Sequence, residues 1–212
     1  MKGVFAHWPN RITALRFVGA LVLFLVFAVM GDLDAMDTLV LGDHEFAMRC
    51  MLQVCFWLFV VVAATDFLDG WLARSGGHVS VFGRIADPFV DKVLILGVMI
   101  FMAVMPWSRD YIPAWLVVVI LAREFLVTGL RGYVESLGAE FSADNLGKIK
   151  MVVQSMAVGG VMFVPAYDWP PALATGLDYL VRFLVVATLV ATLGSGFSYV
   201  KKTMRILSEE NA

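Results

Sequence analysis

Six stretches of mainly apolar residues, each about 20 long or more, restrict this chain to a membrane-spanning helical fold. A helix needs about 20 such residues to cross the hydrocarbon core of a bilayer. Of the 212 residues, 60% are hydrophobic and 16% are charged, and the mean hydropathy is +0.83, which lies outside the range of ordinary soluble domains. The predicted spans cover residues 11–30, 47–72, 84–105, 113–134, 147–166 and 177–199. We therefore predict an all-α fold, in which residues 1–212 form a single domain, an integral membrane bundle of six transmembrane helices.

Basic residues indicate how this bundle is oriented in the membrane. They gather at the two termini and in alternate connections between the predicted spans, whereas the other connections receive only Arg49, Arg109 and Arg182. Connections rich in Lys and Arg remain on the cytoplasmic side. Both termini are therefore predicted to be cytoplasmic.

Four aspartates interrupt the apolar pattern between the second and third predicted spans, at Asp66, Asp69, Asp87 and Asp91. Residues three or four apart lie on one face of a helix, so each pair forms a short stripe of carboxylates. The SGGH turn at residues 75–78 allows the two helices to run antiparallel, which brings the stripes together. Hard divalent cations such as Mg²⁺ or Mn²⁺ would offset the mutual repulsion, and four carboxylates can hold two ions.

A simpler interpretation is that the aspartates cap helices and form interfacial ion pairs with Arg74, Arg84 and Lys92. That interpretation suits a single aspartate at a membrane surface. Four of them on two facing stripes, with the small residues Gly70 and Ala73 beside them, favour a functional site, because ionisable groups within membrane segments usually serve function.

The spacing of these residues resembles the signature of the CDP-alcohol phosphotransferases. It reads Asp66-x2-Asp69-Gly70-x2-Ala73-Arg74-x8-Gly83-x3-Asp87-x3-Asp91, and no position departs from the pattern. The resemblance implies a six-helix membrane enzyme, usually a homodimer. Such an enzyme transfers a phosphatidyl or similar group from a CDP-linked donor to an alcohol and releases CMP.

The resemblance also implies a role for each residue of the signature. The set that would bind two Mg²⁺ or Mn²⁺ ions is Asp66, Asp69, Asp87 and Asp91. Asp91 would also be the catalytic base for the acceptor hydroxyl. The set that would line the CDP site is Asp69, Gly70, Ala73, Arg74 and Gly83. Two cations can stabilise the charge on a leaving pyrophosphate, and small residues let a nucleotide approach the helix backbone.

Basic residues farther along the chain indicate an anionic acceptor. Arg123 and Arg131 lie eight positions apart on one predicted helix, and Lys148 and Lys150 begin the next. Arginine forms forked hydrogen bonds to phosphate and lysine adds a point charge. In the alternative interpretation the two lysines anchor the helix at the cytoplasmic surface, and Arg131 pairs with Glu135.

The run from Ala122 to Met151, with its AREF…LR…LG…GK-K pattern, resembles the acceptor half of bacterial phosphatidylglycerophosphate synthases. The N-terminal PNRITALRF resembles the opening helix of that group, which adds Asn10, Thr13 and Arg16 as candidate contributors. The segment 31–46 and the tail after Ser198 match poorly. The resemblance implies CDP-diacylglycerol as donor and glycerol 3-phosphate as acceptor, an active site on the cytoplasmic face of a bacterial inner membrane, and no nucleic-acid partner.

Two kinds of alternative remain open. The same chemistry could use another acceptor, namely inositol phosphate, serine or phosphatidylglycerol; inositol phosphate would also need the basic cluster, whereas serine would not. A divalent-cation transporter is the alternative outside enzymes. It would place carboxylates near the bilayer midplane on broken helices, whereas the four aspartates gather at one end of two predicted spans.

Overall fold

The computed structural model describes residues 8–35, 44–76, 81–137 and 145–210, and these ranges contain helices and short turns but no strand. The prediction of an all-α fold is confirmed. The helices in chain order are α1 Trp8–Ala35, α2 His44–Gly76, α3 Val81–Val104, α4 Ala114–Ser136, α5 Asn145–Ala166 and α6 Pro171–Glu210. Each predicted span falls on one of these helices.

The largest difference from the predicted spans concerns α6, which has 40 residues. The prediction ended at residue 199 because Lys201, Lys202 and Arg205 interrupt the apolar run. In the structure the helix continues through them, with both lysines exposed and Thr203 buried. An amphipathic continuation of this kind satisfies the helix pattern without being apolar.

Four helices among the described residues contain a segment long and apolar enough to cross a membrane. These segments are Asn10–Asp32, Glu45–Thr65, Gly147–Ala166 and Pro171–Ser208. Large apolar side chains such as Leu25, Trp57, Phe183 and Phe197 are exposed on them, as expected for contact with lipid chains. The protein is therefore a multi-pass membrane protein.

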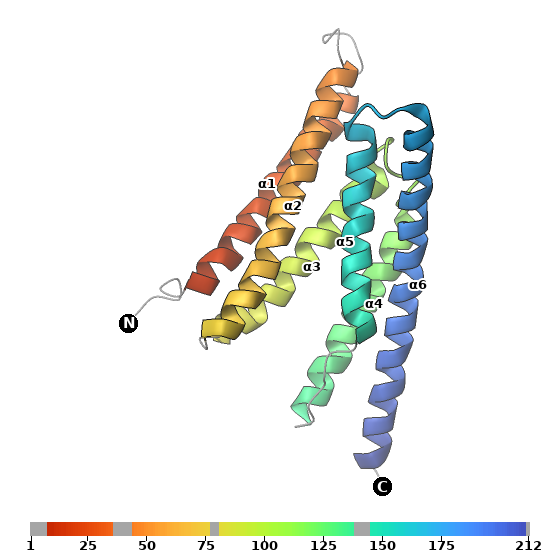
Figure 1. Cartoon of the computed structure of the whole chain (residues 1–212). Coiled ribbons are helices and arrows are strands. Elements are labelled where there is room, and N and C mark those ends of the chain that lie inside the picture. The colour runs from red at the N-terminus through yellow and green to blue at the C-terminus, as the bar shows by residue number, and fades with distance from the viewer. Residues whose placement is uncertain (1–7, 36–43, 77–80, 138–144, 211–212) are drawn as a thin grey trace.

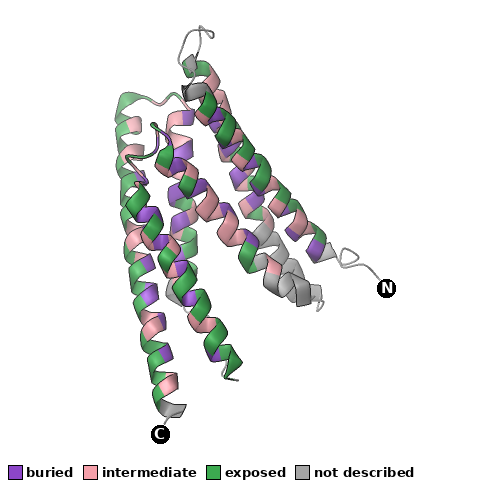
Figure 2. Ribbon diagram, turned by 180° about the vertical axis from the view of Figure 1, so that it is seen from behind, coloured by how far each residue is buried: buried purple, intermediate pink, exposed green. Residues whose placement is uncertain are grey.

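The helices form two groups of three that meet at one end of the molecule and separate toward the other (Figure 1). In the first group α1 packs against α2 and α3, and in the second α6 packs against α4 and α5. Contacts of α2 with α5 and of α3 with α4 join the groups. Figure 2 shows the buried residues along the inward faces of the helices. Glycines provide space at several crossings; for example, a Cβ atom on Gly97 would overlap Phe24, and one on Gly160 would overlap Val181.

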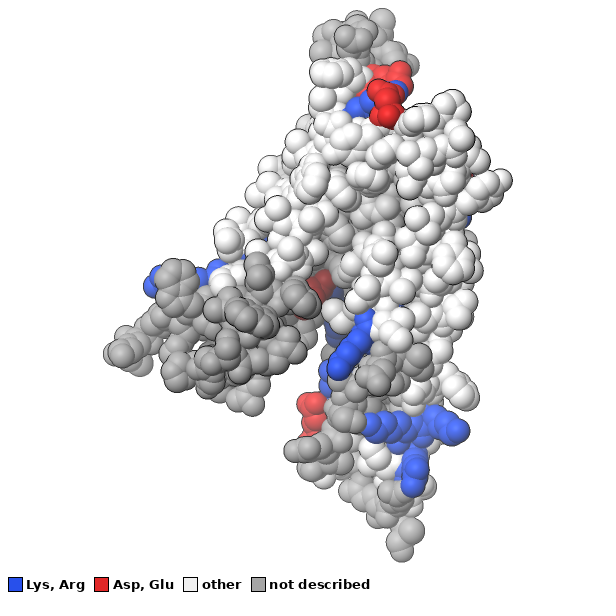
Figure 3. All heavy atoms as spheres, viewed as in Figure 1, with Lys and Arg blue, Asp and Glu red and all other residues white. Residues whose placement is uncertain are grey.

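Ion pairs and a hydrogen bond gather at the end where the two groups meet, and two of these contacts join different elements, Arg49 with Asp168 and Tyr111 with Asp178. Arg49 of α2 pairs with Glu45 and with Asp168 of the α5–α6 connection, and Arg182 pairs with Asp178 at 2.9 Å. Tyr111 donates a hydrogen bond to Asp178, and burial together with this bond raises the pKa of Tyr111. Acidic and basic side chains accordingly lie next to each other at this end (Figure 3). The separated end is therefore the open side of the bundle.

Candidate active site

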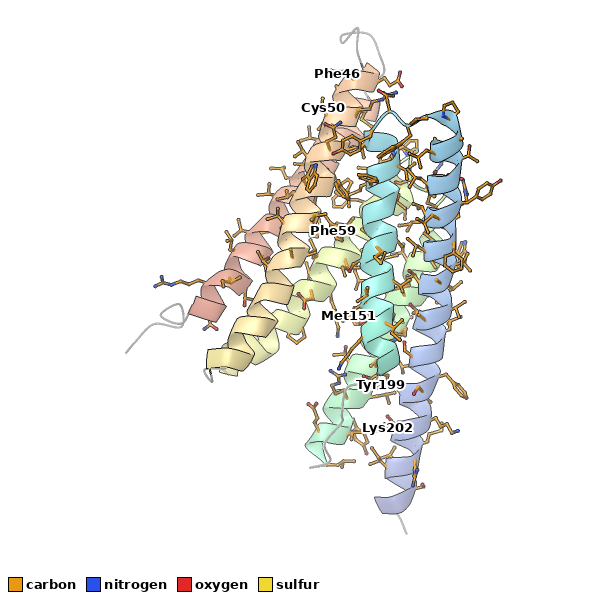
Figure 4. All side chains as sticks on the ribbon, viewed as in Figure 1. Phe46, Cys50, Phe59, Met151, Tyr199 and Lys202 are labelled. Atoms are coloured by element: carbon orange, nitrogen blue, oxygen red, sulfur yellow. The ribbon has the colours of Figure 1, made fainter. Side chains whose placement is uncertain are left out.

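A cavity of about 560 Å³ lies between the two groups of helices. Its wall comes from α3, α4 and α5, with one residue of α6. The lining residues are Pro88, Asp91, Lys92, Ile95, Leu96, Arg123, Glu124, Val127, Thr128, Arg131, Glu135, Gly147, Lys148, Lys150, Met151, Gln154 and Tyr199. Figure 3 shows charged side chains on the walls of the hollow between the groups, and Figure 4 shows Met151 and Tyr199 on α5 and α6. The site thus forms where the helices begin to separate.

The charged residues of this wall are predominantly basic. Five are cationic and three are anionic: Lys92, Arg123, Arg131, Lys148 and Lys150 against Asp91, Glu124 and Glu135. The wall therefore carries two net positive charges when all eight are ionised. A partly enclosed cavity strengthens the attraction of such a wall for an anion. The structure brings together all four residues that the sequence suggested for an anionic acceptor.

Asp91 also lines the cavity, on α3, which belongs to the first group of helices. Its side chain is 19% exposed and pairs with Arg16 of α1, which is only 2% exposed. Asn10, Thr13 and Arg16 recur at steps of three along α1, and all three are buried. The predicted N-terminal residues therefore form one inward face, and Arg16 connects this face directly to the carboxylate of Asp91.

The other residues of the signature lie on α2 and α3, but the structure does not describe their side chains. Asp66, Asp69, Gly70, Ala73 and Arg74 belong to the last turns of α2, and Gly83 and Asp87 to the first turns of α3. Among the side chains that the structure describes, no three His, Cys, Asp or Glu residues form a group that could hold a metal. Asp91 is the described member of the predicted ligand set. Its carboxylate on the cavity wall is the donor type that Mg²⁺ and Mn²⁺ prefer, so this residue fits the predicted ions.

Glu124 is a buried residue of the site that the sequence prediction did not include. One carboxylate oxygen accepts from Arg123 at 2.8 Å and also from Lys150. The other lies 4.0 Å from the amino group of Lys92. Glu124 thus connects α3, α4 and α5 through their cations. A second charge next to Arg123 within an apolar run was a signal that could have identified it.

Residues of α6 hold the two arginines of α4 from the other side. Arg123 donates to the hydroxyl of Ser195 at 2.8 Å, and Arg131 donates to the hydroxyl of Tyr199 at 2.9 Å. The alternative partner of Arg131, Glu135, is exposed. The sequence prediction missed this contribution of α6. The signal in the sequence that could have revealed it is a series of polar residues at helical spacing in an apolar helix. These residues are Thr188, Thr192, Ser195, Tyr199 and Thr203, and all are buried.

Substitution of Glu124 by Gln is expected to destabilise the protein by about 2 kcal/mol, because it leaves buried cations without their shared carboxylate. Thermal unfolding of the purified protein in detergent measures this as a lower Tm. Glu135→Gln is the matched control, since Glu135 is on the same helix and is exposed. Equal Tm values for the two variants would show that Glu124 does not stabilise the cluster.

Comparison with known proteins identifies the family to which this site belongs. The family model of the CDP-alcohol phosphatidyltransferases matches residues 6–194. The chain belongs to the CDP-alcohol phosphatidyltransferase family. It is therefore an enzyme, and the family resemblance inferred from the aspartate signature is confirmed. The matched region ends before Tyr199, so the part of the cavity wall that α6 provides lies beyond it.

Individual relatives of this transferase match over most of its length. It is similar to "CDP-diacylglycerol--glycerol-3-phosphate 3-phosphatidyltransferase" of Bacillus subtilis (strain 168), with 32% identity over 203 residues that cover 96% of this chain and 98% of the relative. The protein of the same name from Rickettsia bellii is 35% identical over 150 residues, 71% of each chain. A "Probable phosphatidylglycerophosphate synthase" of Mycobacterium tuberculosis is 32% identical over 200 residues, 94% of this chain and 83% of the relative.

Proposed function

We propose that this transferase moves the phosphatidyl group of CDP-diacylglycerol to the primary hydroxyl of glycerol 3-phosphate, giving phosphatidylglycerophosphate and CMP. The observation that carries the proposal is the cavity in which Arg123, Arg131, Lys148 and Lys150 share a wall with Asp91. A phosphate monoester carries about two negative charges at neutral pH, which matches the two net positive charges of the wall. The names of the bacterial relatives support the same pair of substrates.

The cavity suggests how the acceptor is used. Its phosphate binds to the basic residues of α4 and α5, and its primary hydroxyl faces Asp91 on α3. The Asp91 carboxylate takes the hydroxyl proton while the oxygen bonds to the phosphorus that carries diacylglycerol. The bond from this phosphorus to the bridging oxygen breaks, and CMP leaves with that oxygen. Positioning and charge stabilisation supply most of the acceleration in reactions of this class.

The donor and the metal ions are assigned to the signature residues. Asp66, Asp69, Asp87 and Asp91 would hold two Mg²⁺ or Mn²⁺ ions, which would neutralise charge developing on the pyrophosphate oxygens. The CDP site would be formed by Asp69, Gly70, Ala73, Arg74 and Gly83. Asp91 belongs to both the metal set and the described cavity wall, so donor and acceptor would meet at this residue.

We further propose a single domain with six membrane spans and both termini in the cytoplasm of a bacterium, and a homodimer as the working unit. Two observations support the crossing by α3 and α4. They pack against α1 and α6, which contain apolar segments long enough to span, and α4 exposes Trp115, Val118 and Phe125. The lysines that follow Tyr199 favour a cytoplasmic location for the open side of the bundle.

The substrate panel is the direct test of the proposed function. Purified protein with CDP-diacylglycerol and Mg²⁺ or Mn²⁺ is expected to release CMP with glycerol 3-phosphate, and far less with serine or phosphatidylglycerol. Chromatography should identify the lipid product as phosphatidylglycerophosphate. Release of CMP with inositol phosphate but not with glycerol 3-phosphate would refute the assigned acceptor. Uptake of Mn²⁺ into proteoliposomes without CMP release would instead support the transporter alternative.

A further inference from the structure

Tyr199, labelled on α6 in Figure 4, contacts both arginines of the cavity. The centre of its ring lies 5.6 Å from the guanidinium carbon of Arg123 and 5.8 Å from that of Arg131. These separations lie within the range of favourable cation–π contacts. Its hydroxyl also accepts the hydrogen bond from Arg131 at 2.9 Å. The side chain is buried, yet it is part of the cavity wall.

The ring determines how two flexible cations are arranged. Arg123 and Arg131 are eight residues apart on α4, which corresponds to about 12 Å along the helix axis. Both guanidinium groups nevertheless approach one ring. Two like charges at this proximity repel each other, and free arginine side chains would lose considerable rotamer entropy on ordering. Contact with the same aromatic ring would offset both costs before any ligand arrives.

Two further observations show that α6 packs closely against Arg123. Arg123 donates to Ser195, one turn before Tyr199. A Cβ atom on Gly196 would lie 3.2 Å from the Cγ atom of Arg123, so glycine at this position leaves room for the stem of the arginine. The residues of α6 that face α4 therefore restrain the Arg123 side chain at both its stem and its guanidinium group. They also restrain the guanidinium group of Arg131.

The arginines retain hydrogen-bonding capacity in this arrangement. The Nε atoms of Arg123 and Arg131 are buried and have no hydrogen-bond partner among the described residues. Buried donors of this kind usually have a partner. A phosphate oxygen in the adjoining cavity would supply one, because arginine binds phosphate through two parallel N–H groups.

We propose that Tyr199 is a positioning residue that fixes Arg123 and Arg131 in the arrangement that binds the phosphate of the acceptor. This inference rests on the proposed function. Tyr199 acts through the arginines and has no part in the bond-forming step. Preorganisation of this kind lowers the ordering cost of binding. Loss of Tyr199 should therefore weaken the acceptor and leave the donor unaffected.

Kinetics of two Tyr199 variants test the proposal. Tyr199→Phe keeps the ring and removes one hydrogen bond to a charged group, so the KM for glycerol 3-phosphate should rise about tenfold. Tyr199→Leu removes the cation–π contacts as well, and a rise of about 100-fold is expected. In both variants kcat and the KM for CDP-diacylglycerol should remain within about twofold of wild type. Phe197→Leu, at an exposed position two residues away, is the control and should match wild type.

A glycine pair provides a test that leaves Tyr199 in place. Gly196→Ala should raise the KM for glycerol 3-phosphate a few-fold, because the new methyl group displaces the stem of Arg123. Gly194→Ala makes the same chemical change on the same helix, where a Cβ atom meets nothing within 4 Å. This variant controls for the effect of alanine on the helix and should keep the wild-type KM.

Binding of inorganic phosphate, followed as a rise in Tm, decides the role of Tyr199 independently of turnover. Wild-type protein should be stabilised by phosphate, and Tyr199→Leu should require about 100-fold more phosphate for the same rise. A wild-type phosphate response or wild-type KM in Tyr199→Leu would overturn the inference, as would an equal rise in both KM values. If wild-type protein binds phosphate but does not use glycerol 3-phosphate, the proposed function fails, and the phosphate titration still decides the role of Tyr199.

Discussion

Asp91→Asn is expected to lower kcat by about 10³-fold or more, with only a modest loss of CDP-diacylglycerol binding. The amide cannot take the proton of the acceptor hydroxyl, and general-base catalysis contributes about 10²–10⁴-fold. It also lacks the charge that a divalent ion requires of its ligand. The measurement is CMP release at saturating concentrations of both substrates, together with the Kd of the donor.

Two controls separate chemistry from folding in this variant. Asp91 pairs with the buried Arg16, so the Tm of Asp91→Asn must be compared with that of Arg16→Gln, which breaks the same pair. A titration with Mn²⁺ then distinguishes the two roles of Asp91. Full recovery of kcat in Asp91→Asn at high Mn²⁺ would assign Asp91 to metal binding alone. A wild-type rate of this variant in the ordinary assay, before the Mn²⁺ concentration is raised, would remove Asp91 as the base.

Arg123→Ala is expected to raise the KM for glycerol 3-phosphate by about 10²–10³-fold, with a smaller decrease in kcat. Two hydrogen bonds from a guanidinium to phosphate are each worth about 1.5–3 kcal/mol, although such contributions are not additive. The substitution also removes one of the cations that share Glu124, so Lys150 loses part of its positioning. Steady-state kinetics with each substrate varied in turn measure the effect.

Arg182→Ala is the matched control for this substitution. Arg182 lies on α6 at the end where the two helix groups meet, and it pairs with Asp178 outside the cavity. Its loss should leave both KM values unchanged. If Arg123→Ala raises the KM for CDP-diacylglycerol as much as that for glycerol 3-phosphate, Arg123 does not belong to the acceptor site.

The helices and five of the eight charged residues of the cavity wall were predictable from sequence, because both depend on local patterns. Apolar runs of sufficient length locate the helices, and charges inside those runs locate residues that must avoid lipid. Arg123, Arg131, Lys148 and Lys150 were grouped on that basis, and they line one cavity. The roles of these residues and of the aspartate signature stay predictions.

What the sequence did not reveal depends on contacts between distant helices. The sequence marks Glu124 only as a second charge beside Arg123, and its role follows from Lys150, 26 positions later, which donates to it. The role of Tyr199 follows from the packing of α6 against α4, which places its ring near Arg123 and Arg131. The predicted sixth span also ended too early, at Tyr199, because a prediction from hydropathy stops at charged residues. The backbone remains helical beyond them, as far as Glu210.

The separation of the two helix groups has a mechanical consequence for the reaction. Asp91 belongs to the group of α1–α3, whereas Arg123, Arg131, Lys148 and Lys150 belong to the group of α4–α6. The groups are joined at the opposite end of the molecule (Figure 1) and also beside the cavity, where Lys92 of α3 donates to Thr128 of α4. These contacts set the angle between the two groups, and this angle sets the distance from the carboxylate to the bound phosphate.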